Sequence, residues 1–306
     1  MIRSALLWAS ENKTIEAQFR KRSFARAAVS RFMPGETLDD ALAECTHLQK
    51  AGISSVITLL GENVGTPGEV DRVVDHYESA FVRIRNGEPD THVSVKLTHL
   101  GLDLGDEVAL VAVRRLASCA ADAGSVLWID MEYSRYVDRT IDVFRRVRAE
   151  GAPLGLCIQA YLHRTPSDLD VLVREGAPIR LVKGAYLEPP EVAIPRKADV
   201  DRQFLAQGLQ LARAYRGEGI RPGIATHDVP LIKQLLEQLG DTAAPPPVEV
   251  QMLYGIQRAA QQDLAESGVP MRVLISYGEA WFPWYVRRLA ERPANVGFVL
   301  RSMLAR

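Results

Sequence analysis

One stretch decides the fold: HVSVKLT (92–98), then DEVALVAVRRLASCAAD (106–122), then SVLWIDME (125–132). The first and last of these runs are rich in β-branched and aromatic residues, which is typical of buried strands. The middle run repeats apolar residues at intervals of three and four, which predicts an amphipathic helix. A strand, a helix and a second strand in succession predict two parallel strands of one sheet.

The same alternation continues on both sides of this unit. The other predicted strands are SSVITLL (54–60), PLGLCIQA (153–160), PIRLVKGAY (178–186), IRPGIATH (220–227), PVEVQMLYG (247–255) and PMRVLISYG (270–278). Many strand starts are about 25–35 residues apart, the size of one βαβ unit. An α/β chain with this many units predicts a closed (β/α)8 TIM barrel. A doubly wound sheet is the alternative, but its usual G-x-G-x-x-G turn is absent from the sequence.

Composition excludes several classes of protein. The chain has 306 residues, of which 47% are hydrophobic and 25% charged, so disorder, collagen and coiled coil are excluded. A formal net charge of −1 gives no general attraction to nucleic acid, and no nucleic-acid partner is expected. Neither C-x-x-C nor H-E-x-x-H spacing occurs, so no metal is expected. No apolar run approaches the roughly 18 residues of a membrane span, and we expect a cytoplasmic protein.

We expect residues 1–306 to form a single catalytic domain. Within it, residues 1–50 are predicted to be an N-terminal helical segment and residues 51–306 the barrel. The stretch Glu16–Phe32 carries five basic residues against one acidic residue. A solvated basic face is the ordinary interpretation. Binding to acidic lipid is the alternative, and it would place the protein peripherally on the inner face of the membrane.

Active sites of such barrels are built from the carboxyl ends of the strands. Polar residues near those ends are Lys96, Asp130, Glu132, Gln159, Arg180, Lys183, Thr226, His227, Tyr254 and Tyr277. A single lysine there usually reaches water, and a single histidine is more often structural. Together these residues predict a polar, cation-rich cavity that can hold an anionic ligand.

Two local features are predicted around these strands. The proline-rich stretch Leu187–Asp201 follows the fifth strand and is predicted to be a long loop that could act as a lid over the catalytic face. Thr37 and Thr165 stand where helix N-caps are expected, and Pro166 can open the helix after Thr165.

The segment after the last strand, YGEAWFPWYVRRLAER (277–292), predicts an aromatic helix. Arg287 and Arg288 are adjacent, so on a helix they point about 100° apart. Two solvated arginines are the ordinary interpretation. The functional interpretation is a clamp that holds a carboxylate between two guanidinium groups.

Several motifs of the chain resemble those of the proline dehydrogenase family. The resemblance rests on SVKLT (94–98), WIDME (128–132), CIQAY (157–161), RLVKGAY (180–186), ATHD (225–228) and the arginine-bearing stretch 277–292, in that order. It extends from about Gly35 to Leu304. The family implies a distorted barrel with N-terminal helices, whose last helix lies over the barrel mouth.

The resemblance implies FAD-dependent oxidation of L-proline to 1-pyrroline-5-carboxylate in proline catabolism, with a membrane quinone as electron acceptor. Residues that match those binding the substrate carboxylate are Lys96, Arg287 and Arg288. Residues that match the pocket wall are Tyr186, Tyr277 and Leu253, with Asp130 as the organising acid. Residues that match flavin contacts are Gln159, Val182, Gly184, Thr226 and His227, with Arg180 beside the flavin N5 atom.

The sequence departs from the family in two places. Trp284 stands where relatives often have tyrosine, and Asp228 stands where the family has asparagine. The first departure affects packing against the proline ring, and the second changes a polar contact near the cofactor. With 306 residues there is no room for an added aldehyde dehydrogenase domain, so the monofunctional form is expected.

Two other functions remain open on the residues alone. A Schiff-base aldolase would use Lys96 or Lys183 as its nucleophile and would bind no cofactor. An inactive barrel could serve as a binding module, although its decay would be expected to erode the polar strand ends. A flavin spectrum that L-proline bleaches would distinguish a proline dehydrogenase from both of these alternatives.

Overall fold

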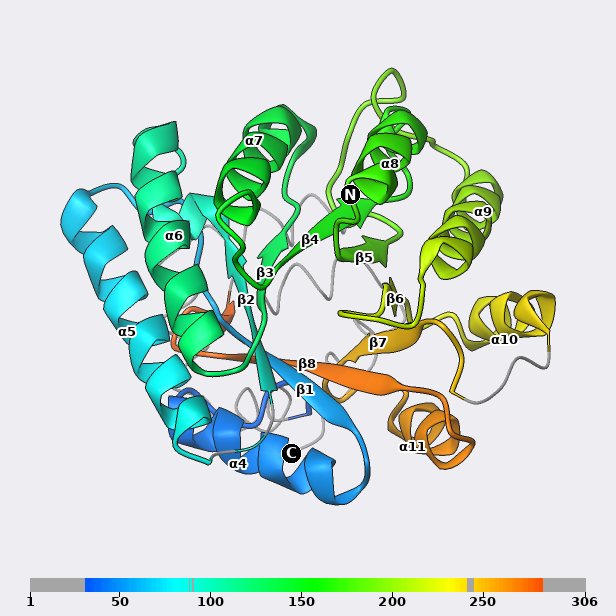
Figure 1. Cartoon of the computed structure of the whole chain (residues 1–306), viewed down its shortest axis with the longest axis horizontal. Helices are drawn as coiled ribbons and strands as arrows, with labels where there is room; N and C mark the ends of the chain where they lie inside the picture. The colour runs from blue at the N-terminus through cyan, green and yellow to red at the C-terminus, as the bar shows by residue number, and fades with distance from the viewer. Residues whose placement is uncertain (1–30, 88, 90, 241–244, 283–306) are drawn as a thin grey trace, which may run out of the picture.

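The computed structural model describes residues 31–87, 89, 91–240 and 245–282. Their strands form a closed parallel barrel in chain order, and β1 pairs with β8 to complete it (Figure 1). The strands are β1 (Ser54–Leu59), β2 (Thr91–Lys96), β3 (Leu127–Asp130), β4 (Leu154–Gln159), β5 (Ile179–Val182), β6 (Gly223–Ala225), β7 (Glu249–Leu253) and β8 (Met271–Tyr277). The predicted (β/α)8 barrel is confirmed.

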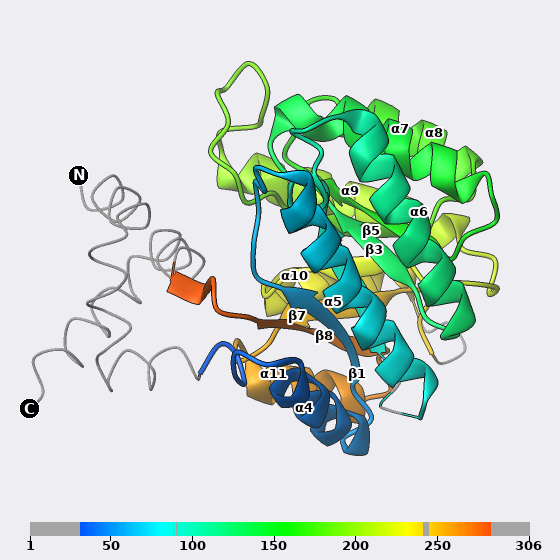
Figure 2. The same cartoon turned by 90° about the vertical axis from the view of Figure 1, so that its left-hand side faces the viewer.

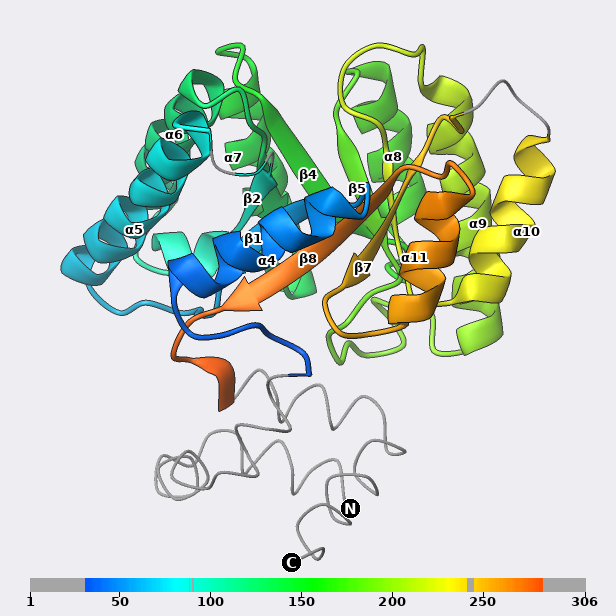
Figure 3. The same cartoon turned by 90° about the horizontal axis from the view of Figure 1, so that it is seen from below.

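Helices surround the barrel. They are α4 (Leu38–Lys50), α5 (Pro67–Arg85), α6 (Asp106–Asp122), α7 (Val137–Arg148), α8 (Thr165–Arg174), α9 (Lys197–Ala214), α10 (Val229–Leu239) and α11 (Arg258–Glu266). Two short 3₁₀ turns, η1 (Leu97–Leu100) and η2 (Ser134–Tyr136), follow β2 and β3. Figure 3 shows α5–α7 on one flank of the barrel and α8–α11 on the other, with α4 alongside β8 and β1.

Helix α4 therefore takes the place in the outer ring between α11 and α5. Its buried face includes Leu42 and Cys45, and it begins with a capping box in which Thr37 and Asp40 satisfy each other's backbone N–H groups. Because α4 covers the junction of β1 and β8, the chain after β8 need not return to the ring. In Figure 2 this chain runs toward the start of α4, where Trp281 Nε1 donates to Glu36 Oε1 at 2.6 Å.

The expected helix over the barrel mouth lies outside the described residues, as does the basic stretch Glu16–Phe32 apart from its last two residues. In the part of the chain that the structure describes, no helix is both long enough and apolar enough to span a bilayer.

The Thr165 prediction is wrong in detail. Thr165 is already the first residue of α8, and its hydroxyl donates to the carbonyl oxygen of Gln159 at 2.6 Å. The threonine is buried and therefore anchors the helix to the end of β4 instead of capping it.

The interior of the barrel contains one large aromatic side chain. Trp128 is fully buried beside Val56 and Val126, and its Nε1 donates to Nδ1 of His92 at 3.1 Å. The neighbouring position on β4 must be glycine, since a Cβ atom on Gly155 would lie 2.4 Å from the Trp128 ring. The indole therefore forms a rigid floor beneath the carboxyl ends of the strands.

Candidate active site

Polar side chains converge at the carboxyl ends of the strands because the strands are parallel and in register. Lys96 on β2 is the register partner of Asp130 on β3, and Gln159 on β4 is the partner of Val182 on β5. Side chains alternate along a strand, so every second residue points into the barrel. The register therefore places Lys96, Asp130 and Gln159 at the same end of the barrel, as the sequence predicted.

Arg180 is the most constrained of the predicted residues. Its Nε donates to Gln251 Oε1 at 2.7 Å, and its Nη1 donates to Asp130 Oδ1 at 2.9 Å and to Ser94 Oγ at 3.0 Å. The guanidinium carbon lies 4.6 Å from the centre of the Trp128 ring. Only 3% of the side chain is exposed. Its Nη2 is buried and nevertheless has no hydrogen-bond partner among the described residues. A buried donor of this kind is costly to leave unpaired, so it marks the place for an acceptor.

Arg180 and Lys183 supply less free positive charge than the sequence suggested. The charge of Arg180 is balanced by Asp130, and Lys183 faces outward toward α9, where its Nζ lies 5.9 Å from the Phe204 ring centre. Lys96 is half-buried, and its ammonium has no hydrogen-bond or ion-pair partner within the described part of the chain. Lys96 is thus the described cation best placed for an anionic ligand.

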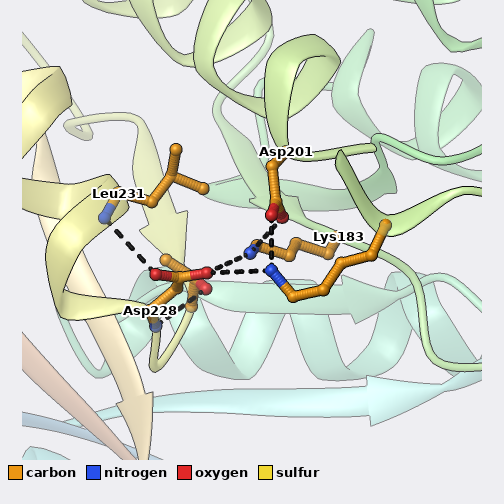
Figure 4. A network of polar contacts seen from close by, with 6 residues as sticks. Lys183, Asp201, Asp228 and Leu231 are labelled. Carbon is orange, nitrogen blue, oxygen red and sulfur yellow. Dashed lines mark hydrogen bonds and ion pairs between the residues drawn. The ribbon is translucent and has the colours of Figure 1, made fainter. Parts of the chain in front are cut away.

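Lys183 belongs to a four-membered group of charges that we call the Lys183 clasp: Lys183, Lys197, Asp201 and Asp228. Figure 4 shows its ammonium between two carboxylates, with distances of 2.5 Å to Asp201 Oδ1 and 2.8 Å to Asp228 Oδ2. Lys197 bonds to the same two carboxylates. The hydrogen bond from Lys183 holds the pKa of Asp228 below its usual value. The clasp joins the end of β5, the end of β6 and the start of α9.

Asp228 also organises the turn after β6. Its Oδ1 accepts from the backbone N–H of Leu231, which caps α10, and its own N–H donates to Thr226 Oγ1 at 3.2 Å. The preceding residue, His227, accepts a hydrogen bond at Nε2 from the backbone N–H of Leu253 at 2.9 Å. The carboxylate of Asp228 is therefore a structural group that pairs with Lys183.

The loop after β5 is held in place by its neighbours. Gly184 has φ +122, and a Cβ atom there would lie 2.1 Å from the Tyr161 ring, so glycine is required. The amide of Gln159 donates to the carbonyl of Glu132 at 2.7 Å and accepts from the N–H of Ala185 at 3.5 Å. These contacts fix the backbone beside the half-buried Val182.

The predicted lid is shorter than expected and is anchored. Helix α9 begins at Lys197, so the last residues of the stretch Leu187–Asp201 are helical. Glu188 accepts from the backbone N–H and the hydroxyl of Ser134, at 2.6 and 2.8 Å. The N–H of Ile194 donates to the carbonyl of Tyr161 at 2.8 Å. This loop is therefore tied to the loops that follow β3 and β4.

The predicted pocket tyrosines occupy different settings. Tyr277 is fully buried, its hydroxyl lies 2.9 Å from His76 Nε2, and burial raises its pKa. Tyr186 is half-buried, and its ring centre lies 4.3 Å from that of Tyr133. Arg287, Arg288 and Trp284 lie outside the described residues.

The buried carboxylate Glu132 accepts from the backbone N–H and the hydroxyl of Thr98, at 3.1 and 2.7 Å. Burial raises its pKa, and the two bonds from Thr98 and the charge of Lys96 oppose that rise. Among the described residues, no group of three histidines, cysteines or carboxylates could hold a metal ion.

His99 gives a testable pH dependence. It is 8% exposed, and burial, with the charges of Lys96 and His76, lowers its pKa to about 4. The unfolded chain takes up the proton near pH 6.5, whereas the folded protein resists it until about pH 4. The stabilisation is therefore complete above about pH 6.5, and about 3 kcal/mol is lost as the pH falls to about 4.

Urea unfolding of the protein and of His99→Gln, measured between pH 7 and pH 4, checks this expectation. The variant should lose less unfolding free energy on acidification than the parent protein. Equal pH dependence of the two proteins would show that His99 does not carry the effect.

Sequence reasoning missed several residues of this network: Ser94, Glu249, Gln251 and Arg272. Their side chains lie inside the barrel, on strand residues that precede the carboxyl ends. Their signal was nevertheless present, because Glu249, Gln251 and Leu253 are spaced by two in a buried strand and so point into the same space.

Comparison with known proteins identifies the family. A sequence profile described as "Proline dehydrogenase" matches residues 41–301. "Proline dehydrogenase 1" of Bacillus subtilis subsp. natto is 36% identical over 305 residues, covering 99% of both chains. "Proline dehydrogenase" of Deinococcus radiodurans is 34% identical over 314 residues, covering 99% of this chain and 98% of that protein.

A solved structure shares the fold. Proline utilization A (PutA) from Bdellovibrio bacteriovorus, inactivated by N-propargylglycine, superimposes with a TM-score of 0.77 at 22% identity. The match covers 94% of this chain and 38% of the longer PutA chain. The profile match spans most of the barrel, and the full-length relatives exceed 30% identity. The chain therefore belongs to the proline dehydrogenase family.

Proposed function

We propose that this chain oxidises L-proline to 1-pyrroline-5-carboxylate in proline catabolism, with FAD as its cofactor and a quinone as electron acceptor. We also propose that residues 1–306 act as one catalytic domain, in which the segment 1–50 ends in α4 of the outer ring and residues 51–306 supply the strands and the other helices of the barrel. The observation that carries the proposal is the buried Nη2 of Arg180 beneath the strand ends, which has no hydrogen-bond partner in the part of the chain that the structure describes.

The described residues fit a flavin. Arg180 offers a buried positive donor, while Gln159 and Gly184 keep the loop backbone after β5 close to the strand ends. We assign Gln159, Arg180, Val182, Gly184, Thr226 and His227 to the cofactor. Bound FAD supplies the hydride acceptor, while the protein supplies orientation and electrostatics.

The substrate is held by charge at one end and by apolar surface at the other. In this proposal Lys96, Arg287 and Arg288 bind the carboxylate of proline. Tyr186 and Leu253 form the wall around the ring, Tyr277 supports that wall from the side of α5, where its hydroxyl lies beside His76, and Asp130 keeps Arg180 in place. Positive charges near the amine favour its unprotonated form, which is the form that can lose a hydride.

The route of the electrons beyond the barrel is a further part of the proposal. A quinone dissolved in lipid requires at least transient contact with a bilayer. We propose a cytoplasmic protein that touches the inner face of the membrane peripherally, through the basic face of Glu16–Phe32. Five basic residues against one acidic residue in that stretch support this assignment.

An absorption spectrum tests the central proposal. We expect purified protein, supplemented with FAD, to show flavin bands that L-proline bleaches in the absence of oxygen. Pyrrolidine is the matched control because it has the same ring without the carboxylate, and it should leave the bands unchanged, since the cations would stay unpaired.

A protein that binds no flavin would contradict the proposal, as would bleaching by pyrrolidine at the rate seen with proline. Borohydride trapping of a carbonyl substrate on Lys96 or Lys183, without a flavin, would instead support the aldolase alternative.

A further inference from the structure

Four interior side chains connect three strands below the candidate site, and we call them the Gln251 relay: Arg180, Gln251, Glu249 and Arg272. Gln251 Oε1 accepts from Arg180 Nε, and Gln251 Nε2 donates to Glu249 Oε1, both at 2.7 Å. Arg272 Nε donates to Glu249 Oε1 at 2.8 Å. Contacts thus continue without a gap from β8 to the guanidinium of Arg180.

The relay is anchored at the seam of the barrel. Arg272 Nη1 donates to the carbonyl oxygen of Ser55 at 2.6 Å, which joins β8 to β1. The side chains of Arg272 and Glu249 are 7% and 13% exposed, so each is the other's charge partner in a largely dry interior. Truncating one member of such a pair leaves the other charge without compensation.

The charge of Glu249 fixes the direction of the Gln251 amide. An ionised carboxylate can only accept hydrogen bonds, so the amide must turn its NH₂ group toward Glu249. Its oxygen is then obliged to face Arg180 Nε. Gln251 is 4% exposed, so a reversed amide would place two donors together at Arg180 and two acceptors together at Glu249, without water to relieve either.

Two edges of the Arg180 guanidinium are thereby defined. Gln251 holds Nε, while Asp130 and Ser94 hold Nη1, and Trp128 packs against the face. A planar group fixed at two of its nitrogens has one orientation, and that orientation determines where Nη2 points. Nη2 is the buried donor without a partner among the described residues.

We infer that Gln251 is a positioning residue, which aims Nη2 of Arg180 at the flavin through an amide oriented by the Glu249–Arg272 pair. This inference rests on the proposed function. Removal of a donor aimed at developing charge commonly costs about 10²–10³ in rate, and a displaced donor should cost less. We therefore expect loss of Gln251 to slow flavin reduction about tenfold.

Gln251→Met tests the inference, since methionine has a similar length but offers no amide. The flavin-loaded variant should be reduced by L-proline about tenfold more slowly in anaerobic stopped-flow. Its midpoint potential should also be more negative than that of the parent protein, since the displaced donor stabilises the reduced flavin less. Gln207→Met on α9 is the matched control, because Gln207 is equally buried and its amide has no partner among the described residues.

Glu249→Gln provides the second variant, because it keeps Gln251 and removes the charge that orients the amide, and it also leaves the buried Arg272 without its charge partner. Its potential should shift in the same direction by a smaller amount, and it decides the question if Gln251→Met does not load flavin. Unchanged potential and reduction rate in either loaded variant would overturn the inference. Failure of the proposed function itself would differ, since the parent protein would then not be bleached by proline.

Discussion

Arg180→Met should lower the turnover of L-proline by about 10²–10³-fold and make the bound flavin harder to reduce. The side chain is buried and is the one we assign beside the flavin, so methionine removes a positive donor from the place where negative charge develops. Steady-state turnover with a quinone analogue and the midpoint potential of the flavin measure the two effects. The affinity for an unreactive proline analogue should change much less.

Arg180→Lys is the control that separates charge from shape. Lysine keeps the positive charge, but it cannot reproduce the simultaneous contacts with Gln251 and Asp130. We expect lysine to recover part of the potential and little of the rate. A midpoint potential in Arg180→Met equal to that of the parent would refute the assignment of this arginine to the flavin.

Asp130→Ala should lower the free energy of unfolding by about 3 kcal/mol or more, in addition to impairing activity. The variant leaves Arg180 charged and 3% exposed, with Ser94 and Gln251 as neutral partners only. Urea denaturation monitored by tryptophan fluorescence provides the measurement, because Trp128 packs against the same arginine.

Glu150→Ala is the matched comparison for Asp130→Ala. Glu150 also pairs with an arginine, Arg114, but both side chains are nearly half exposed, so water replaces the lost partner. We expect only a small change in stability for this surface variant. Equal losses for the two substitutions would mean that the Arg180–Asp130 pair is not energetically a buried pair.

The fold was predictable because a parallel barrel needs strands that are buried on both faces. Such strands appear as short apolar runs between amphipathic helices, and each predicted run coincides with an observed strand. The place of α4 in the outer ring was not predictable from the same pattern. An amphipathic helix shows that it buries one face, but which surface it covers depends on where the barrel closes.

The residues of the candidate site could be predicted where they lie at strand ends. The directions in which their side chains point could not be predicted. Lys96, Asp130 and Gln159 follow from the register of parallel strands. The side chain of Lys183 points outward because it pairs with Asp201 in the first turns of α9. The sequence did not predict the start of this helix, because prolines precede it. The Gln251 relay lies inside the barrel on residues that precede the carboxyl ends of their strands, where an apolar interior is the usual expectation.

The contact between Trp128 and Gly155 constrains how the sequences of relatives can diverge. Any side chain at position 155 would enter the space of the indole, whose nearest atom would be 2.4 Å from the new Cβ. Alanine at position 155 therefore requires a residue smaller than tryptophan at position 128. If the alanine came first, its Cβ atom would clash with the indole. Because the indole also packs against Arg180, a smaller residue at position 128 would loosen the candidate site, so we expect substitutions at these two positions to be coupled.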